Sequence, residues 1–192
     1  MTESRTPARD TAAAAPGWRQ RFLLAHFHDY TPAAMRMWLA IAVAGALALI
    51  AALVAMLSPT APDRLQTLIA LLFVAVAACF PVQIPRTKYS IGAADVFVFL
   101  MLAVLGPPAA VLAVGLEGAI GACRGSKRWS SRISTPAAAM ASMAICGVLF
   151  EALWPLAAGW GLQAPTAKLI VLLPLALVPF VLPTFALMAT VT

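Results

Sequence analysis

Long apolar runs separated by short polar segments make up most of the chain from residue 37 onward. The first run, residues 37–57, is about 20 residues long, which is the length at which an α-helix crosses a bilayer. It ends at SPTAPDR, where two prolines stop the helix and a charged pair marks water. Similar runs cover residues 65–80, 136–154 and 169–191. The pattern therefore predicts an all-α fold, a polytopic transmembrane helical bundle.

Two shorter apolar segments flank the sequence GPP at 106–108. Glycine and proline together favour a sharp turn, so the chain from about 91 to 122 is expected to form a short helical hairpin. With this hairpin the bundle has about six spans. The last run contains three prolines, which are tolerated in a lipid-embedded bundle but should bend the helix.

The segment at 81–95, PVQIPRTKYSIGAAD, interrupts the apolar pattern with two prolines, a glycine and two cations. It is expected to be irregular, and non-helical backbone at membrane depth persists only where protein or a water-filled cavity satisfies it. Gln83, Thr87, Tyr89 and Ser90 would line such a site. The alternative is a plain cytoplasmic loop.

The N-terminal part of the chain has a different character. Residues 1–17 are rich in Ala, Thr, Pro and charge without apolar periodicity, which is typical of a disordered tail. Residues 18–30, WRQRFLLAHFHDY, place apolar and basic side chains at helical spacing, as an interfacial amphipathic helix does. The transmembrane domain would then cover residues 31–192.

Composition supports a membrane location, because 62% of the residues are apolar and 10% are charged, against about 25% charged in soluble domains. The net charge of +6 could suggest nucleic acid, but the cations cluster between the apolar runs, so no nucleic-acid partner is expected. Cytoplasmic loops of membrane proteins carry excess Lys and Arg. If the N-terminus lies inside, eleven cations fall on the cytoplasmic side (Arg5, Arg9, Arg19, Arg21, Arg36, Arg86, Lys88, Arg124, Lys127, Arg128, Arg132) and two outside (Arg64, Lys168). This predicts a bacterial inner-membrane protein with both termini in the cytoplasm.

Acidic residues inside membrane segments are functional candidates, because they are energetically costly there. Asp95 and Glu117 lie at matching distances on either side of the Gly106 turn, so they should face each other at one depth and could share a proton or hold a cation. Two structural roles compete: Asp95 could cap its helix, and Glu117 could pair with Arg124. Glu151 is close enough to a helix end to be solvated. The small residues around Glu117 allow close helix packing.

No catalytic, metal or cofactor site is expected. The three cysteines have no metal-ligand spacing and are predicted to be packing residues. His26 and His28 would point in different directions on a helix. The chain also lacks phosphate-loop and nucleophile-base patterns, so it is predicted not to be an enzyme.

The stretch from Phe80 to Gly125 resembles the N-terminal integral-membrane sensor regions that precede GGDEF, HD-GYP or related output domains in bacterial signalling proteins. The matching features are an apolar helix ending in Pro, a polar link, a D-x-x-x-F-L helix, a GP-x-A-A turn and a Gly-punctuated helix ending in Arg. An Asn-containing helix start usual in that family is replaced here by Ile133-Ser-Thr-Pro-Ala. The matching positions are Pro85, Ser90, Asp95, Phe99, Gly106, Pro107, Ala109, Ala110, Gly118, Gly121 and Arg124.

The resemblance implies a sensory input module, connected with cyclic di-GMP, that works as a homodimer. Its partners would be the lipid bilayer, a small apolar ligand and a cytoplasmic output domain; since no output domain precedes Thr192, either the chain is a fragment or the output partner is separate. The candidate ligand-binding or coupling residues are Asp95, Glu117, Gln83, Tyr89 and Ser90. Two alternatives stay open, namely a small substrate-binding subunit of an uptake system, with broken helices typical of transporters, and a structural assembly subunit.

Overall fold

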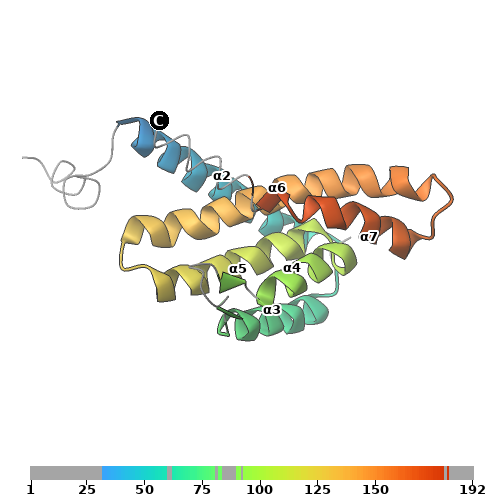
Figure 1. The fold of residues 1–192 in the computed structure, drawn as a ribbon, viewed down its shortest axis with the longest axis horizontal. Coiled ribbons are helices and arrows are strands. Elements are labelled where there is room, and N and C mark those ends of the chain that lie inside the picture. The colour runs from blue at the N-terminus through green and yellow to red at the C-terminus, as the bar shows by residue number, and fades with distance from the viewer. Residues whose placement is uncertain are drawn as a thin grey trace, which may run out of the picture.

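The computed structural model describes residues 32–59, 62–80, 82–83, 90–91, 93–179 and 181. Within these ranges the fold is helical, apart from one pair of two-residue strands (Figure 1). The helices are α2 (Pro32–Leu57), α3 (Arg64–Ala78), α4 (Ala93–Val104), α5 (Pro107–Gly125), α6 (Trp129–Ala158) and α7 (Ala164–Leu175). The strands β1 (Val82–Gln83) and β2 (Ser90–Ile91) pair antiparallel between α3 and α4.

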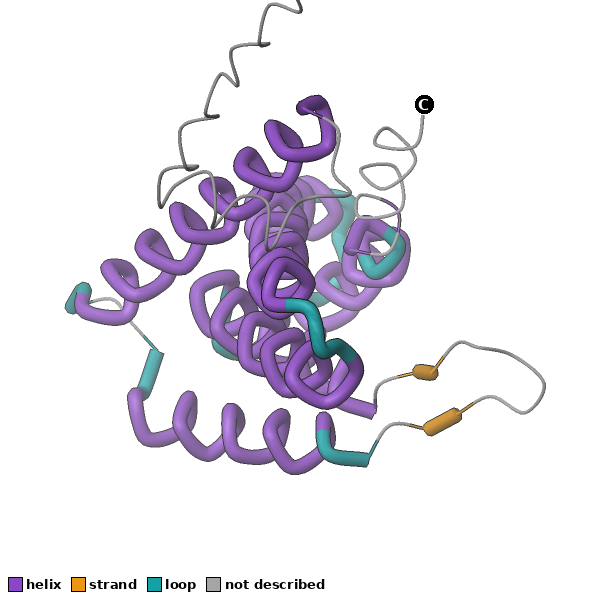
Figure 2. Tube along the Cα trace, turned by 90° about the vertical axis from the view of Figure 1, so that its left-hand side faces the viewer, coloured by secondary structure: helices purple, strands orange, loops and turns teal. Residues whose placement is uncertain are grey.

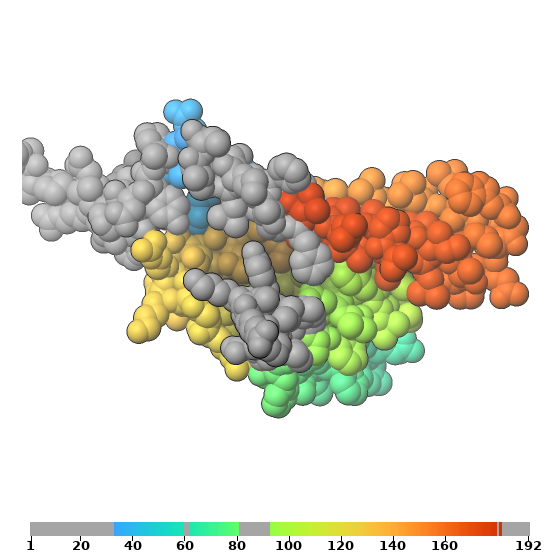
Figure 3. Space-filling view, in the orientation of Figure 1, coloured from blue at the N-terminus to red at the C-terminus, as the bar shows by residue number. Residues whose placement is uncertain are grey.

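Helix α5 lies at the centre of the bundle and packs against α2, α3, α4 and α6. Helix α6 is the longest and runs along both α5 and α7 (Figure 1). The end where α6 meets α7 projects beyond the layer formed by α3, α4 and α5 (Figure 3). The largest fully buried side chains come from α3, α4 and α6, and the core cluster also takes in residues of α2, α5 and α7. These six side chains are Phe150, Leu102, Met143, Val74, Val98 and Cys146.

Glycines set the closest helix contacts. A Cβ added at Gly45 of α2 would lie 2.4 Å from the Cα of Ala137 on α6. A Cβ at Gly118 of α5 would lie 3.0 Å from the Cα of Pro136. Small residues of this kind let helix backbones approach closely where lipid supplies no hydrophobic driving force. The small-residue packing predicted around Glu117 is therefore present between α5 and α6.

The predicted turn at Gly106 is confirmed. Gly106 has φ 87° and immediately precedes α5, and glycine adopts this left-handed region without the strain of a Cβ. Pro107 takes the first helical position, where its missing N–H is no loss. The hairpin of α4 and α5 is thus built as the sequence indicates.

In the connection at 81–95, the described residues form a short strand pair and the start of a helix. The strands stand apart from the helices (Figure 2), with Gln83 opposite Ser90. The irregular segment ends earlier than expected, because α4 begins at Ala93 and already contains Asp95 in its first turn. A carboxylate is favoured there by the positive end of the helix dipole.

Two other boundaries differ from the sequence prediction. The fifth helix begins at Trp129 rather than Pro136, so most of the polar stretch before Pro136 is helical. Two side-chain hydrogen bonds stabilise the N-terminal end of α6. Arg132 Nε donates to the Ser126 carbonyl, and Trp38 Nε1 donates to the Ser130 carbonyl. The last helix begins at Ala164, and α7 stops at Leu175, one residue after Pro174.

The helical class is confirmed, and two helices, α2 and α6, are long and apolar enough to cross a membrane. Helices α3, α4 and α7 are apolar but shorter, with 15, 12 and 12 residues. The packing role predicted for the cysteines holds for buried Cys146 and is wrong for Cys79 and Cys123, which are exposed. The predicted tail at 1–17, the interfacial helix at 18–30 and the end of the run at 169–191 lie outside the described residues.

Candidate functional site

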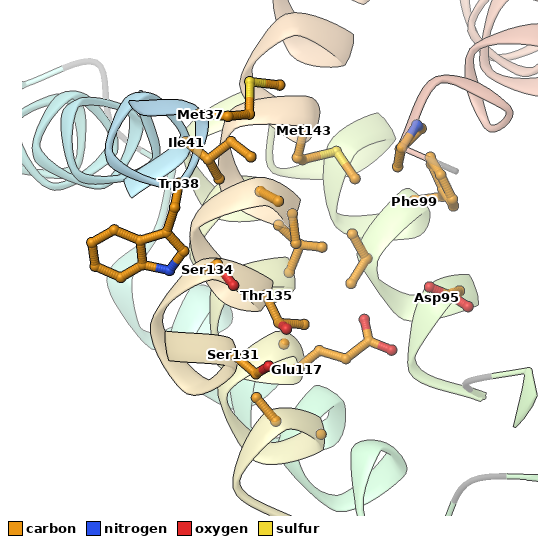
Figure 4. Close-up of a pocket in the computed structure, with 18 of the residues that line it drawn as sticks. Met37, Trp38, Ile41, Asp95, Phe99, Glu117, Ser131, Ser134, Thr135 and Met143 are labelled. Carbon is orange, nitrogen blue, oxygen red and sulfur yellow. The ribbon is translucent and has the colours of Figure 1, made fainter. Parts of the chain in front are cut away.

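A cavity of about 670 Å³ lies between α2, α4, α5 and α6 (Figure 4). Cavities that bind organic ligands typically measure about 300–1,000 Å³, so this one has the size of a small-molecule site. Pro179, which follows α7, also lines it. The lining residues used below are Asp95 and Phe99 of α4, Val114, Glu117 and Gly121 of α5, and Ser131, Ser134, Thr135 and Met143 of α6.

Polar and apolar groups occupy different parts of this cavity. Figure 4 shows Ser131, Thr135 and Glu117 near one end, while Met37, Ile41 and Met143 gather near the other. The polar end lies toward the short α5–α6 turn, because Ser131 is near the start of α6. The cavity is thus amphipathic along its length.

Two carboxylates face the cavity from neighbouring helices. The Glu117 side chain reaches from α5 toward the side where Asp95 of α4 lies (Figure 4), so that a negative charge on one carboxyl disfavours a negative charge on the other. Glu117 Oε2 is a buried atom without a hydrogen-bond partner among the described residues. The structure therefore brings together the two carboxylates that the sequence places at one depth.

The predicted pairing of Glu117 with Arg124 does not account for this carboxylate. Arg124 Nη1 instead donates to the carbonyl of Cys79 at 2.6 Å and to that of Ala78 at 3.5 Å. These carbonyls belong to the open C-terminal end of α3. Arg124 thus caps the C-terminal end of α3. It does not pair with Glu117, whose Oε2 atom has no hydrogen-bond partner among the described residues.

Glu151 lies outside the cavity lining. It is exposed, and its Oε2 accepts a hydrogen bond from Trp154 Nε1 at 3.3 Å. The ring of Trp154 also lies beneath the Lys168 ammonium, 5.3 Å from nitrogen to ring centre. This group forms part of the α6–α7 end, as expected for a residue near a helix terminus.

The remaining predicted site residues are not brought to the cavity by the described structure. Gln83 and Ser90 lie in the strand pair, of which only the backbone is described, and Thr87 and Tyr89 fall outside the described residues. Sequence reasoning missed the hydroxyls of Ser131, Ser134 and Thr135. Their i, i+3, i+4 spacing would have indicated that they share one face of a helix. The sequence prediction instead treated this polar stretch as a loop.

Comparisons with protein-family models, curated proteins and solved structures gave no match to this chain.

Proposed function

We propose that this chain is the membrane-embedded input module of a bacterial signalling protein, connected with cyclic di-GMP, and that its cavity receives the ligand. One observation carries the proposal: Pro179, which lies on the C-terminal side of α7, lines the same cavity as the two carboxylates. A ligand there would touch α2, α4, α5 and the segment that leads toward the C-terminus. Binding could therefore bias that segment between two packing arrangements.

The membrane location is supported by the surface of the bundle. Helix α2 has a mean hydropathy of 2.7 over its most apolar window, yet only 17% of that window is buried. Exposed leucines such as Leu47, Leu57 and Leu72 have 62%, 74% and 65% of their surface accessible. Soluble monomers rarely expose apolar patches of more than a few hundred Å², whereas such a surface suits lipid.

The proposed topology has six spans and both termini in the cytoplasm. It places the basic α5–α6 turn, with exposed Lys127 and Arg128, on the cytoplasmic side, following the bias of Lys and Arg toward that face. The α6–α7 turn then lies outside, where exposed Trp160 suits the interface preferred by indoles. The polar end of the cavity would face the cytoplasm.

The proposal is tested by joining the full chain at Thr192 to a GGDEF cyclase domain and measuring cyclic di-GMP in cells. Gly121→Leu adds a bulky side chain at a residue that lines the cavity, where a Cβ meets no atom within 4 Å. Gly125→Leu is the matched control, because Gly125 has equal space on the same helix and does not line the cavity.

Filling the cavity should change cyclase output by about tenfold, which corresponds to about 1.4 kcal/mol in a two-state equilibrium. The control should behave as the parent chimera. Equal output from all three chimeras, at equal membrane abundance, would contradict an input role for the cavity.

A second candidate is a small transport component, in which the carboxylates couple to the substrate. The observation favouring it is the unpaired Glu117 Oε2 inside the bundle, since intramembrane carboxylates often serve transport. Broken elements such as the α7 end after Pro174 are also common there. Uptake of a labelled organic amine by vesicles, lost in Glu117→Gln, would favour transport over signalling.

A further inference from the structure

We infer that the cavity binds an amphipathic organic cation, whose ammonium head lies between Asp95 and Glu117 and whose apolar part extends toward Val114 and Met143. This inference rests on the proposed function, because it names the ligand class of the same site. It is carried by three features of the cavity, namely the charges in its lining, the unpaired carboxylate oxygen and its volume.

The sign of the head group follows from the lining. Asp95 and Glu117 are the ionisable side chains among the described residues that line the cavity, and both are carboxyl groups, which can carry negative but not positive charge. The nearby cation Arg124 is bound to the end of α3, and Arg132 Nε is bound to the Ser126 carbonyl. Like charges facing one cavity repel an anion and attract a cation.

The position of the head follows from hydrogen bonding. An ammonium has three N–H donors and no acceptor. The polar end offers acceptors in Glu117, Thr135 and Ser131 (Figure 4), among which Glu117 Oε2 is buried without a partner. A buried carboxylate oxygen without a partner is unfavourable, so a donor placed there gains a charge-assisted hydrogen bond.

The size and opposite end of the cavity indicate an organic body rather than a bare ion. A metal ion or a proton would leave most of about 670 Å³ unfilled. Val98, Phe99, Val114 and Met143 line the remainder. Methionine adapts to irregular apolar shapes, which suits a flexible chain or a compact hydrocarbon body.

The test uses three probes with one tail, namely decylammonium, decanol and decanoate, titrated calorimetrically into the full chain in lipid nanodiscs, with empty nanodiscs subtracted. We expect decylammonium to bind at least about tenfold more tightly than decanol, equivalent to about 1.4 kcal/mol, and decanoate to bind more weakly than both. Glu117→Gln should remove the preference for the ammonium. Glu151→Gln is the matched control, since Glu151 is exposed outside the cavity.

Gly121→Leu should weaken the binding of both decylammonium and decanol, while Gly125→Leu should bind like the parent chain. Because all variants are measured in the same lipid, partition of the probes into the bilayer cancels between them. These two glycine variants keep the test decisive if Glu117→Gln fails to fold.

Equal affinity for decanol and decylammonium, an unchanged preference in Glu117→Gln, or no saturable binding of any probe would each overturn the cationic ligand. If any of these is found while Gly121→Leu still alters the output of the cyclase chimera, the input function stands and only the ligand class fails. If decylammonium binds as expected but Gly121→Leu leaves the cyclase output of the chimera unchanged, the binding site is supported and the signalling role is refuted.

Discussion

Replacing Gly45 by alanine tests the helix contact that holds α2 to the bundle. The added Cβ would lie 2.4 Å from Ala137 Cα, 2.5 Å from its Cβ and 2.6 Å from its carbonyl oxygen. Carbon atoms in contact prefer about 3.5–4.0 Å, so α2 and α6 must separate by about 1.1–1.6 Å. Two of the three atoms belong to the backbone, which cannot turn aside as a flexible side chain does.

The expected effect is a loss of stability. Overpacking in a well-packed contact costs about 1–3 kcal/mol. The matched control is Gly121→Ala, whose Cβ meets no atom within 4 Å and which should gain about 0.5–1 kcal/mol from the better helix propensity of alanine. Gly45→Ala gains the same helix propensity, which therefore cancels between the two variants, and their free energies of unfolding should differ by the overpacking cost of about 1–3 kcal/mol.

The assay is reversible unfolding in mixed micelles, in which the fraction of a denaturing detergent is raised and helix content is followed by circular dichroism. Gly45→Ala should unfold at a lower detergent fraction than the parent chain, and Gly121→Ala at a higher one. Equal midpoints for both variants would refute the close α2–α6 contact and, with it, the α2 wall of the cavity.

Three further outcomes are expected. Mass spectrometry after maleimide treatment in mild detergent should show adducts on exposed Cys79 and Cys123, with Cys146 reacting only after unfolding; rapid labelling of all three would contradict the α6–α7 packing. Arg124→Gln should speed amide hydrogen exchange in the last turn of α3, because it removes the hydrogen bond to the Cys79 carbonyl, and unchanged exchange would contradict that role. Phe150→Ala should lower the free energy of unfolding by about 3–5 kcal/mol, because Phe150 is 1% exposed; in the same micelle titration, a loss below about 1 kcal/mol would contradict its central packing.

Apolar run length and the Gly106 turn were enough to predict the helical class, the α4–α5 hairpin and the facing of Asp95 and Glu117. Helix boundaries were harder to predict from the sequence. The polarity of residues 126–135 indicates contact with solvent, but a polar segment can be either a loop or a helix. Pro136 reinforced the error, since proline usually marks the first turn of a helix. In the fold, Pro136 lies inside α6 and packs against Gly118.

The cavity itself could not be derived from the chain. Its walls combine residues of α2, α4, α5 and α6 with Pro179, and such a set depends on how the helices cross. The hydrogen-bond partner of Arg124 also depends on tertiary structure. Helical spacing offered Glu117 as its partner, whereas the open carbonyls at the end of α3 lie within its reach only because α3 packs against α5.

The unequal lengths of the helices give the bundle two sides of different height. With a rise of about 1.5 Å per residue, the 26 residues of α2 extend about 39 Å, and the 15 residues of α3 about 22 Å. Bilayer hydrocarbon is about 30 Å thick. If α3 spans the membrane, as the proposed topology requires, lipids beside α3 must compress while those beside α2 need not, at a modest cost for each ångström of mismatch. Such a protein would accumulate where acyl chains are short, and its packing would change with the chain length of the surrounding lipid.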